Sequence, residues 1–522
     1  MCNWPKKDYL HSVVSAEEMM LIENNLFSEG MPEPSLMEKV GISMSQYLLD
    51  NQNLLDKGVL VLIGPGHNGG DGAILARELF LKDVDVSFWC PFPIKKQLTS
   101  SHVEYIKFLG IQEVENIPDV MENKLWIEAL FGINQKRNLP YELNELFHKR
   151  ELLRPNKLIS LDVPAGISSD TGELVSSNPA RASITLTVGL IKQGLLQDIA
   201  LPYVGKIEVI DIGLKEDLIS SSSSNFFSIT PKDFSNLEIP KALPNSGKYE
   251  RGRTLIIAGS EKYKGAAYLA LKGSLSSSVG SIKTIIPKNM GESLWQLAPE
   301  VVIEASSDIS LEGSALFSEI LKNINFSRFD SILLGPGIGI DKQDWEKSMN
   351  YFLEFKGLLV IDADGLNRIS LIDNLNWLRD REGQTWLTPH FAEFRRLFPN
   401  VNGDSLIQKV RNAAIQSHST VLLKGANSLI SDTNGNLWQI SGTNPNCARA
   451  GFGDLLSGFL AGMGAYEIAC NSKVIPESLA KYALLHAIAG CFASNGTEAT
   501  IVGDTLKKIV VKKSERCHEK DI

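Results

Sequence analysis

Short apolar runs alternate with helix-like segments in two separate blocks of the chain, and this alternation limits the fold more than any other feature. The first block has two helices, Ser15–Phe27 and Ser35–Asp50, then a strand at Val59–Ile63 and a helix at Ala73–Phe80. The second block starts with a strand at Thr254–Ala258. Buried strands that alternate with helices are typical of a mostly parallel sheet with helices on both faces, so we expect an α/β protein. Further strands of the first block are expected at Val84–Cys90, Leu125–Leu130, Leu158–Val163, Ile184–Val188 and Ile207–Ile212.

The length and an aperiodic stretch divide the chain. At 522 residues it is too long for one ordinary core, so two domains are expected. Between Leu214 and Gly247 the periodicity is lost, and the run Ser220–Ser224 lies there, which indicates a linker or a wrapping arm. We therefore place the domains at residues 1–214 and 247–514, joined by a linker at 215–246.

Composition excludes several classes of protein. The formal net charge of −9 argues against a nucleic-acid binder. The six cysteines form no C-x-x-C pair, which indicates reduced thiols in a cytoplasmic protein without a zinc site. No stretch reaches the roughly 18 apolar residues of a membrane span, and the first residues lack a signal-peptide pattern. We expect a soluble protein with no membrane or nucleic-acid partner, in which anionic ligands need local anion-binding sites.

A glycine-rich segment, Gly64–Gly72, follows the Val59–Ile63 strand and precedes a helix. It contains G-x-G-x-x-G, a pattern typical of pyrophosphate binding. Asp71 within the segment, and Cys90-Pro91 in place of an acid at the end of the next strand, argue against an ordinary NAD site. We predict a phosphate-bearing ligand in another pose. The alternative is a tight glycine turn needed only for packing.

Three acidic residues come at the ends of successive elements of the first block. Asp71 follows the first strand, while Glu128 and Asp162 lie at the ends of two later strands. Ligands of open parallel sheets bind beyond the carboxyl ends of the strands, so these acids are predicted to converge on one site. Each acid taken singly could instead cap a turn.

A second glycine-rich segment ends at Asp454. Gly451 and Gly453 precede this aspartate, and a small-residue apolar helix follows it. The start of a helix presents unpaired N–H groups and a positive dipole end to an anion. A carboxylate there can take the proton of a hydroxyl that attacks a phosphoryl group. The alternative is that Asp454 caps the helix.

Other polar residues of the second block also follow apolar strands. Asp362 and Asp364 could hold a divalent cation between phosphates, or one could be satisfied by backbone amides of a turn. His390, three residues before Glu393, is either a hydrogen-bonded structural histidine or a ligand contact. The Lys424–Gly425 turn either faces a nucleotide or is a surface turn.

The segments GPGHNGGDG, WIEALFG and LDVPAGISSDTGE resemble the NAD(P)H-hydrate epimerase family over about Ser15 to Gly213. The resemblance implies a Rossmann-like three-layer sandwich in which Asp162 is the catalytic acid/base. It also implies a potassium ion at the positions of Asn68, Glu128 and Ala165. Glu128 and Ala165 stand where the family has Asp and Ser, and His67 stands for Asn. The implied nucleotide-binding residues are His67, Asn68, Gly69, Gly70, Asp71, Gly132, Ile133, Asn134, Gln135, Lys136, Arg137 and Asn138.

The segments LLGPGIG, VIDADGLN, LTPHFAEF, VLLKGA and AGFGDLLSG resemble the ADP/ATP-dependent NAD(P)H-hydrate dehydratase family, with a ribokinase-like fold, over residues 246–511. The resemblance implies that Asp454 is the catalytic base and that Gly453 meets the nucleotide phosphate. Arg449, Ala450 and Phe452 stand for the family's Thr, Gly and Thr; Arg449 either supplies charge to a phosphate or narrows the pocket. The other implied contacts, to the hydrate or the nucleotide, are Gly339, His390, Lys424, Gly425, Ala426, Asn427 and Ser428.

Together the halves resemble enzymes that repair hydrated nicotinamide nucleotides. We expect an epimerase joined to a dehydratase, with NADHX or NADPHX as substrate, ADP as co-substrate, Mg²⁺ and potassium as cofactors, and a homo-oligomeric assembly. ADP rather than ATP is expected because the epimerase comes first in the fusion. Two alternatives remain: a ribokinase-type vitamin or sugar kinase, and a first half that binds nucleotide without catalysis.

Overall fold

The computed structural model describes residues 4–133, 135–220, 225–372 and 374–519. Their contacts form two compact units. The N-terminal unit is Lys6–Ser228, and the C-terminal unit runs from Ile229 onward and includes Trp4 and Pro5. The expected domain bounds at 214 and 247 remain a prediction. Residues 221–224 of the serine run lie outside the described residues, and the rest of the predicted linker contains three short elements, α7 (Glu216–Ser220), β10 (Phe226–Ile229) and the 3₁₀ helix η3 (Pro231–Asn236).

The N-terminal unit contains a seven-stranded sheet in the order β4-β3-β2-β5-β6-β7-β9. All neighbouring pairs are parallel, and β1 pairs with β8 in a small parallel ladder. The six strands predicted for this block are confirmed, with ends that differ by at most two residues. The strands are β1 (Val13–Val14), β2 (Val59–Ile63), β3 (Val86–Trp89), β4 (Gln112–Glu113), β5 (Leu125–Ala129), β6 (Leu158–Leu161), β7 (Ile184–Val188), β8 (Ile191–Lys192) and β9 (Lys206–Ile210).

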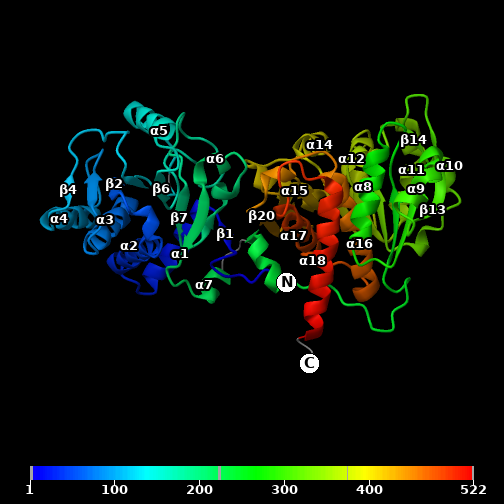
Figure 1. Cartoon of the computed structure of the whole chain (residues 1–522), viewed down its shortest axis with the longest axis horizontal. Coiled ribbons are helices and arrows are strands. Elements are labelled where there is room, and N and C mark those ends of the chain that lie inside the picture. The colour runs from blue at the N-terminus through cyan, green and yellow to red at the C-terminus, as the bar shows by residue number, and fades with distance from the viewer. Residues whose placement is uncertain (1–3, 134, 221–224, 373, 520–522) are drawn as a thin grey trace. The chain divides into compact units, whose positions relative to one another are not determined.

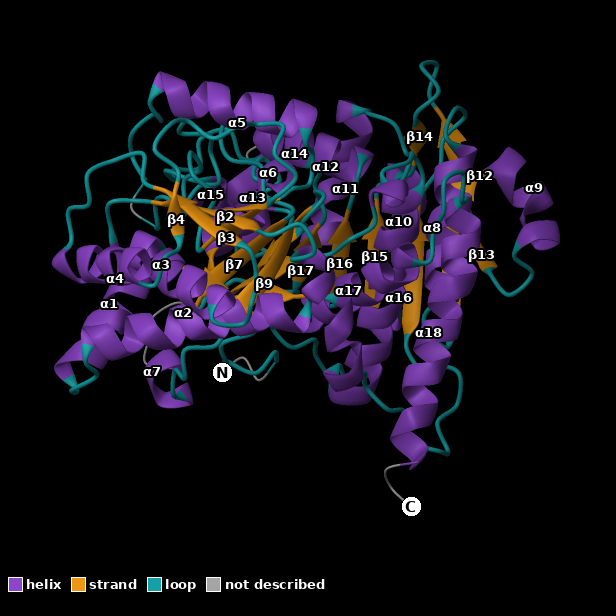
Figure 2. Ribbon diagram, turned by 60° about the vertical axis from the view of Figure 1, so that its left-hand side comes forward, coloured by secondary structure: helices purple, strands orange, loops and turns teal. Residues whose placement is uncertain are grey.

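The strand β2 shows why the unit has three layers. Its side chains alternate between two buried clusters, as expected for a strand covered on both sides. Val61 packs in the cluster that includes residues of α1 to α4, and Leu60 packs with α5 residues such as Phe147. The predicted three-layer α/β sandwich is confirmed, and helices flank these strands in Figure 2. The helices are α1 (Ala16–Ser28), α2 (Glu33–Asp50), η1 (Gln52–Leu54), α3 (His67–Phe80), α4 (Gln97–Phe108), α5 (Tyr141–Leu153), η2 (Gln193–Leu196) and α6 (Leu201–Val204).

Local sequence accounts for one helix start and not for another. Ser15 caps α1 and forms a capping box with Glu18, as the predicted start at Ser15 requires. By contrast, α3 begins at His67, six residues before the predicted Ala73. Glycines disfavour helices intrinsically, but tertiary packing overrides propensity here. The nucleotide-binding segment 67–71 is therefore the first turn of α3 and not a free loop.

The C-terminal unit contains a mixed sheet whose strands follow the order β20-β19-β18-β17-β16-β15-β11-β12-β13-β14. The central pairs from β18 to β13 are parallel, and the outer pairs β13–β14, β18–β19 and β19–β20 are antiparallel. The α/β class is confirmed for this unit as well. Its strands are β11 (Arg253–Ile257), β12 (Ser281–Pro287), β13 (Val302–Ile309), β14 (Ala315–Leu316), β15 (Ser331–Leu334), β16 (Leu358–Ile361), β17 (Thr385–Leu387), β18 (Thr420–Leu423), β19 (Leu429–Ser431) and β20 (Leu437–Ile440).

The apolar helix predicted after Asp454 is α16 (Phe452–Asn471), which contains Asp454 and is the central helix of this unit. It packs on β11, β15 and β16 and on its neighbour α8, and α18 packs on both helices (Figure 1). Throughout the described ranges, no helix has the length and apolar character that a membrane crossing requires. The helices are α8 (Lys264–Leu275), α9 (Lys288–Leu297), α10 (Ser318–Leu321), η4 (Phe326–Arg328), α11 (Lys342–Glu354), α12 (Asp364–Ile369), α13 (Asn374–Arg379), α14 (Phe391–Leu397), α15 (Leu406–Ser417), η5 (Pro445–Cys447), α16 (Phe452–Asn471), α17 (Ser478–Cys491) and α18 (Ala499–Glu519).

Candidate functional site

The glycine turn between β2 and α3 serves packing and also leaves a helix start open. A Cβ on Gly64 would lie 1.8 Å from the Leu130 carbonyl oxygen, and a Cβ on Gly69 would lie 2.1 Å from the Gly64 oxygen. These two glycines are therefore required by close backbone approach. Gly66, the N-cap residue of α3, faces open space. The packing alternative explains part of the glycine pattern, while the open N-terminus of α3 suits an anion.

A cavity of about 750 Å³ lies beside this turn. Its charged lining side chains, among the described residues, are all basic: Lys95, Lys136 and Arg137. A basic lining suits the phosphates of a dinucleotide. Lys95 was not predicted from the sequence, and Asn134 lies outside the described residues. Seven predicted nucleotide-binding residues line the cavity, namely His67, Asn68, Gly132, Gln135, Lys136, Arg137 and Asn138.

Three predicted nucleotide-binding residues contact the protein interior. A Cβ on Gly70 would lie 2.5 Å from the sulfur of Met37. Ile133 packs against two buried apolar clusters, and its carbonyl oxygen accepts a hydrogen bond from Ser169 Oγ at 2.7 Å. Gly69 is buried by the close approach described above. These residues shape the wall of the site, and direct ligand contact by them remains a prediction.

Asp162 lies at the carboxyl end of β6 in a strained conformation, with a φ of 66°. Non-glycine residues rarely adopt positive φ, and such strain gathers at functional sites. Its Oδ1 accepts hydrogen bonds from Lys192 Nζ at 2.6 Å and from the Val188 amide at 3.3 Å. Its Oδ2 points toward Gly132, where an added Cβ would lie 3.4 Å away. Oδ1 is thus held by two hydrogen bonds, and Oδ2 faces Gly132, which lines the cavity.

Two further acids interact with Asp162. Burial raises the pKa of Asp71 well above its usual range, and the charges of Asp162 and Glu23 add to this shift. Burial also raises the pKa of Glu23 on α1, although the Lys192 charge opposes the shift. The predicted convergence of Asp71 with Asp162 is thereby supported electrostatically. Glu23 and Lys192 were missed from the sequence; the one available signal was a lysine directly after the apolar pair Leu190–Ile191.

Glu128, the third predicted acid, has structural partners. It is fully buried, and its oxygens accept the amide N–H groups of Leu130 at 2.8 Å and Ala165 at 3.0 Å. Burial raises the pKa of Glu128 to about 7, although the hydrogen bonds from these amides lower it. Glu128 thus ties the end of β5 to the segment that follows Asp162.

The predicted potassium ligands fit a cation only in part. Asn68 Oδ1 is buried with no hydrogen-bond partner among the described residues, so it could face a cation. Both oxygens of Glu128, however, already accept amide N–H groups. Ala165 offers no side-chain oxygen, and its carbonyl accepts the Ala180 amide at 2.8 Å. These three residues do not form a cage of side-chain oxygens, so no chemical step is assigned here to potassium.

Asp454 lies in the first turn of α16 without capping it. The N-cap residue is Gly451, whose φ is 89°, and no side chain makes a capping hydrogen bond. The capping alternative for Asp454 is therefore wrong. Gly453 lies against Lys424, whose Nζ would be 3.4 Å from an added Cβ. The start of α16 thus combines a helix N-terminus, an ammonium group and a carboxylate.

Three acids interact with Lys424 at this helix start, namely Asp362, Glu393 and Asp454. Lys424 Nζ lies 2.7 Å from Oδ1 of the buried Asp362. Burial raises the pKa of Asp454 to about 7, with Asp362, Asp364 and Glu393 adding to the shift and Lys424 opposing it. For Lys424 itself, burial acts to lower the pKa, but Asp362 and Glu393 outweigh it and the pKa is raised. A carboxyl with a pKa near 7 is poised to exchange a proton at neutral pH.

Asp364 has a different role from Asp362. Its oxygens accept the Gly339 amide at 2.9 Å and the Asn367 side-chain amide at 3.2 Å, so it positions the turn at Gly339. Between the two acids, Ala363 is strained, with φ 49° and ψ −121°. The described residues contain no group of three His, Cys, Asp or Glu side chains arranged to hold a metal. A divalent cation here would need oxygens from a nucleotide phosphate.

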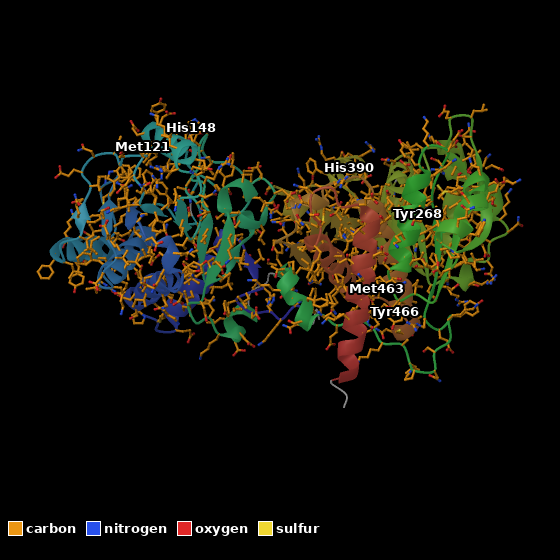
Figure 3. All side chains as sticks on the ribbon, viewed as in Figure 1. Met121, His148, Tyr268, His390, Met463 and Tyr466 are labelled. Carbon is orange, nitrogen blue, oxygen red and sulfur yellow. The ribbon has the colours of Figure 1, made fainter. Side chains whose placement is uncertain are left out.

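His390 has the structural role that was one of its two predicted alternatives, and contact with a ligand remains a prediction. Its Nδ1 accepts the Ala392 amide at 3.1 Å and caps α14, and its Nε2 lies 3.3 Å from Glu393. The side chain is nevertheless 55% exposed (Figure 3). A structural hydrogen bond therefore leaves one ring edge accessible to a ligand. Glu393, buried and paired with His390, was not predicted as a site residue.

The Lys424–Ser428 segment is the turn between β18 and β19. Gly425 and Ala426 are exposed at this turn, as the surface-turn alternative expects, but the Lys424 side chain points back to Asp362. Nucleotide contact along this turn remains a prediction. Arg449 donates a hydrogen bond from Nη1 to the Thr497 carbonyl at 2.9 Å, which ties the segment before α16 to the segment before α18.

Comparison with known proteins gives matches over both units. The family described as YjeF-related protein N-terminus matches residues 33–194, and the family described as NAD(P)H-hydrate dehydratase matches residues 254–510. A bifunctional NAD(P)H-hydrate repair enzyme of Synechocystis sp. is 35% identical over 499 residues, covering 95% of this chain and 93% of that relative. A protein of the same name from Gloeobacter violaceus is 33% identical over 458 residues, covering 87% and 88%. The structure of an ADP/ATP-dependent NAD(P)H-hydrate dehydratase from Bacillus subtilis is 22% identical, with a TM-score of 0.43, and covers 54% of this chain and 97% of its own.

Proposed function

The chain belongs to the bifunctional NAD(P)H-hydrate repair enzymes, and we propose that Asp454 carries its dehydratase reaction and Asp162 its epimerase reaction. As a member of this family it is an enzyme with both activities. The relatives favour repair over the vitamin or sugar kinase alternative, and an epimerase over a non-catalytic first half. The roles of single residues are our proposal.

In the dehydratase reaction, a hydrated ring carries a hydroxyl that leaves poorly. Asp454 takes the hydroxyl proton as the oxygen attacks the β-phosphoryl group of ADP, and AMP leaves. The phosphorylated hydroxyl is then expelled as phosphate with help from the ring nitrogen lone pair, and loss of a proton from the neighbouring ring carbon restores NAD(P)H. Lys424 and the amides at the start of α16 offset the charge of the transferring phosphoryl group.

Mg²⁺ fits this site only together with the nucleotide. Asp362 is already paired with Lys424, and both oxygens of Asp364 accept hydrogen bonds. Mg²⁺ is commonly held by one or two carboxylates plus substrate phosphates, and when bound it neutralises phosphate charge. Asp364, half-buried and so able to reach a ligand, is the residue we expect beside the Mg²⁺ ion.

We propose ADP as the preferred phosphoryl donor. Initial rates with ADP and with ATP test this preference, and a strong preference for ATP would contradict it.

In the epimerase reaction, the R hydrate becomes the S form that the dehydratase accepts. The cavity beside α3 binds the hydrated nucleotide through its basic lining. Asp162 Oδ2 then takes the hydroxyl proton as the bond between the hydroxyl-bearing carbon and the ring nitrogen breaks. The nitrogen re-adds to the opposite face of the resulting carbonyl and the proton returns to the oxygen, so that the carbon inverts. We further propose that the protein is a homo-oligomer of the cytoplasm. Size-exclusion chromatography with light scattering would test the oligomeric state.

The observation that carries the proposal is the meeting of Asp454, Lys424 and Asp362 at the open start of α16. The direct test mixes the protein with R and S hydrates and ADP, and follows NADH absorbance and free phosphate together. Return of NADH with equimolar phosphate is expected. A stable phosphorylated product without NADH would overturn the proposal and favour the kinase alternative.

A further inference from the structure

Lys192 is one of the most deeply buried charged side chains of the N-terminal unit, with only 1% of its side chain exposed. Burying an ammonium group is costly unless its N–H groups are all paired. Lys192 Nζ lies 2.6 Å from Asp162 Oδ1, 2.6 Å from the Val188 carbonyl oxygen and 3.3 Å from Thr187 Oγ1. An ammonium has three N–H donors, so these three acceptors satisfy it completely.

The partner carboxylate is held unevenly as a result. Asp162 Oδ1 accepts from Lys192 and from the Val188 amide, which uses the lone pairs of that oxygen. Oδ2 faces Gly132, which lines the cavity, and the hydrogen bonds of the described residues leave this oxygen for a ligand. The strained φ of 66° at Asp162 shows that the surrounding structure fixes the direction of the side chain.

We propose that Lys192 is a positioning residue of the epimerase site, which turns Asp162 Oδ2 toward the bound hydrate and offsets the negative charge of the acids around it. This inference rests on the proposed role of Asp162.

The neighbouring groups make a positive charge necessary at this position. Asp71 of α3 and Glu23 of α1 both interact with Asp162, so three carboxyl groups from three elements meet here. Like charges so close cannot all ionise, and one carboxyl takes up a proton when nothing offsets them. Among the described residues, Lys192 is the cation that interacts with both Asp162 and Glu23. Without it, the three carboxyl groups would meet with no cation to offset them.

A purely structural role for Lys192 and a positioning role predict different effects when the lysine is removed. A structural lysine would only tie β8 to the end of β6, and its loss would lower stability without changing how activity depends on pH. A positioning lysine sits outside the cavity lining, so its loss should lower kcat and leave KM nearly unchanged. It should also move the pH profile to higher pH, because one of the three neighbouring carboxyl groups then takes up a proton.

The test measures conversion of pure R hydrate to NADH by the full-length protein with ADP, across pH, in four variants. Lys192→Met should lower the epimerisation kcat by about 10²-fold, the lower range for removing general acid–base catalysis, and move the rising limb to higher pH. Lys192→Arg, which keeps the charge, should retain more activity with the wild-type pH profile. Thr187→Val is the matched control, because it removes a Lys192 partner but leaves the ion pair, and should stay close to wild type. If the Met variant does not fold, Lys192→Gln takes its place as the variant that removes the positive charge.

The results distinguish failure of the positioning role of Lys192 from failure of the proposed epimerase function. Wild-type kcat in the Met and Gln variants overturns the role of Lys192, and so does an equal loss in the Arg, Met and Gln variants with an unchanged pH profile. Asp162→Ala, measured alongside, reports on the proposed function. If Asp162→Ala epimerises at the wild-type rate, the proposed function itself fails; if it is inactive while Lys192→Gln is normal, only the positioning role fails.

Discussion

The two candidate sites place the same residue type, an aspartate, in opposite electrostatic settings. In the N-terminal unit, Asp162 has a buried lysine 2.6 Å from one oxygen. In the C-terminal unit, the lysine at the site is already paired with Asp362, and burial with the neighbouring acids raises the pKa of Asp454 to about 7. One carboxylate is matched by a cation, and the other is kept close to its protonation point.

This difference indicates different chemical demands. A base that removes a hydroxyl proton during phosphoryl transfer benefits from a pKa near the working pH. An aspartate that must offer one defined oxygen to a bound ring benefits more from rigid placement, which the ion pair and the strained backbone of Asp162 supply. Pairs of titratable groups in unlike environments are how one protein carries out two proton transfers.

The largest expected effect comes from Asp454→Asn. Removing a general base should lower dehydration of the S hydrate by about 10²–10⁴-fold, while asparagine keeps the shape of the side chain. Initial rates of NADH formation at saturating ADP measure the loss, and nucleotide binding by calorimetry provides the control. Turnover close to wild type would show that Asp454 is not the base.

A smaller loss is expected for Lys424→Met. The change leaves Asp362 buried without its cation and removes positive charge beside Gly453. Hydrogen bonds to charged groups contribute about 1.5–3 kcal/mol, so kcat should fall by about 10–100-fold. Lys424→Arg is the matched control, since it keeps the charge. An unchanged kcat in the methionine variant would remove Lys424 from the phosphoryl site.

The pH dependence of dehydration should follow the raised pKa of Asp454. The base must be ionised to act, so kcat for the S hydrate should rise through about pH 7 and fall about tenfold per unit below it. The same shift makes the folded state bind an extra proton between the unfolded pKa and about 7, so this group costs stability as pH rises through that window. A kcat that is already maximal at pH 5.5 would contradict the assignment.

The smallest effect is expected from removing potassium. Both oxygens of Glu128 are occupied by amides and Ala165 has no side-chain oxygen, so exchange of potassium for a large organic cation should change epimerisation by less than about threefold, under 1 kcal/mol. The R hydrate assay at constant ionic strength measures this. A complete loss of activity would show that a cation is bound through other oxygens.

Sequence patterns predicted the elements better than their beginnings. Apolar runs placed the strands within one or two residues, and Ser15 marked the start of α1. The start of α3 at His67 could not be predicted, because its glycines pack against residues that are distant in the chain, Gly70 against Met37 and Gly72 against Ala129. Local propensity carries no record of such contacts.

The candidate sites were predictable at their strand ends and not beyond them. Asp162 and Asp454 follow recognisable motifs, so sequence alone indicated them. Lys192 and Glu393 could not be assigned roles, because both act through partners that only the fold brings near. Glu128 shows the converse case, since a strand-end acid predicted as a cation ligand accepts backbone amides instead.

The central claim is that two aspartates in two units carry two separable reactions, and one crossed assay tests it. Pure R and pure S hydrates are each incubated with ADP and with Asp162→Ala or Asp454→Asn, and NADH and the R to S ratio are followed together. Asp162→Ala should dehydrate the S hydrate at the wild-type rate but convert the R hydrate only as fast as it epimerises spontaneously. Asp454→Asn should dehydrate neither form yet still equilibrate them. Rapid conversion of the R hydrate by Asp162→Ala, or loss of both activities in either variant, would contradict the account.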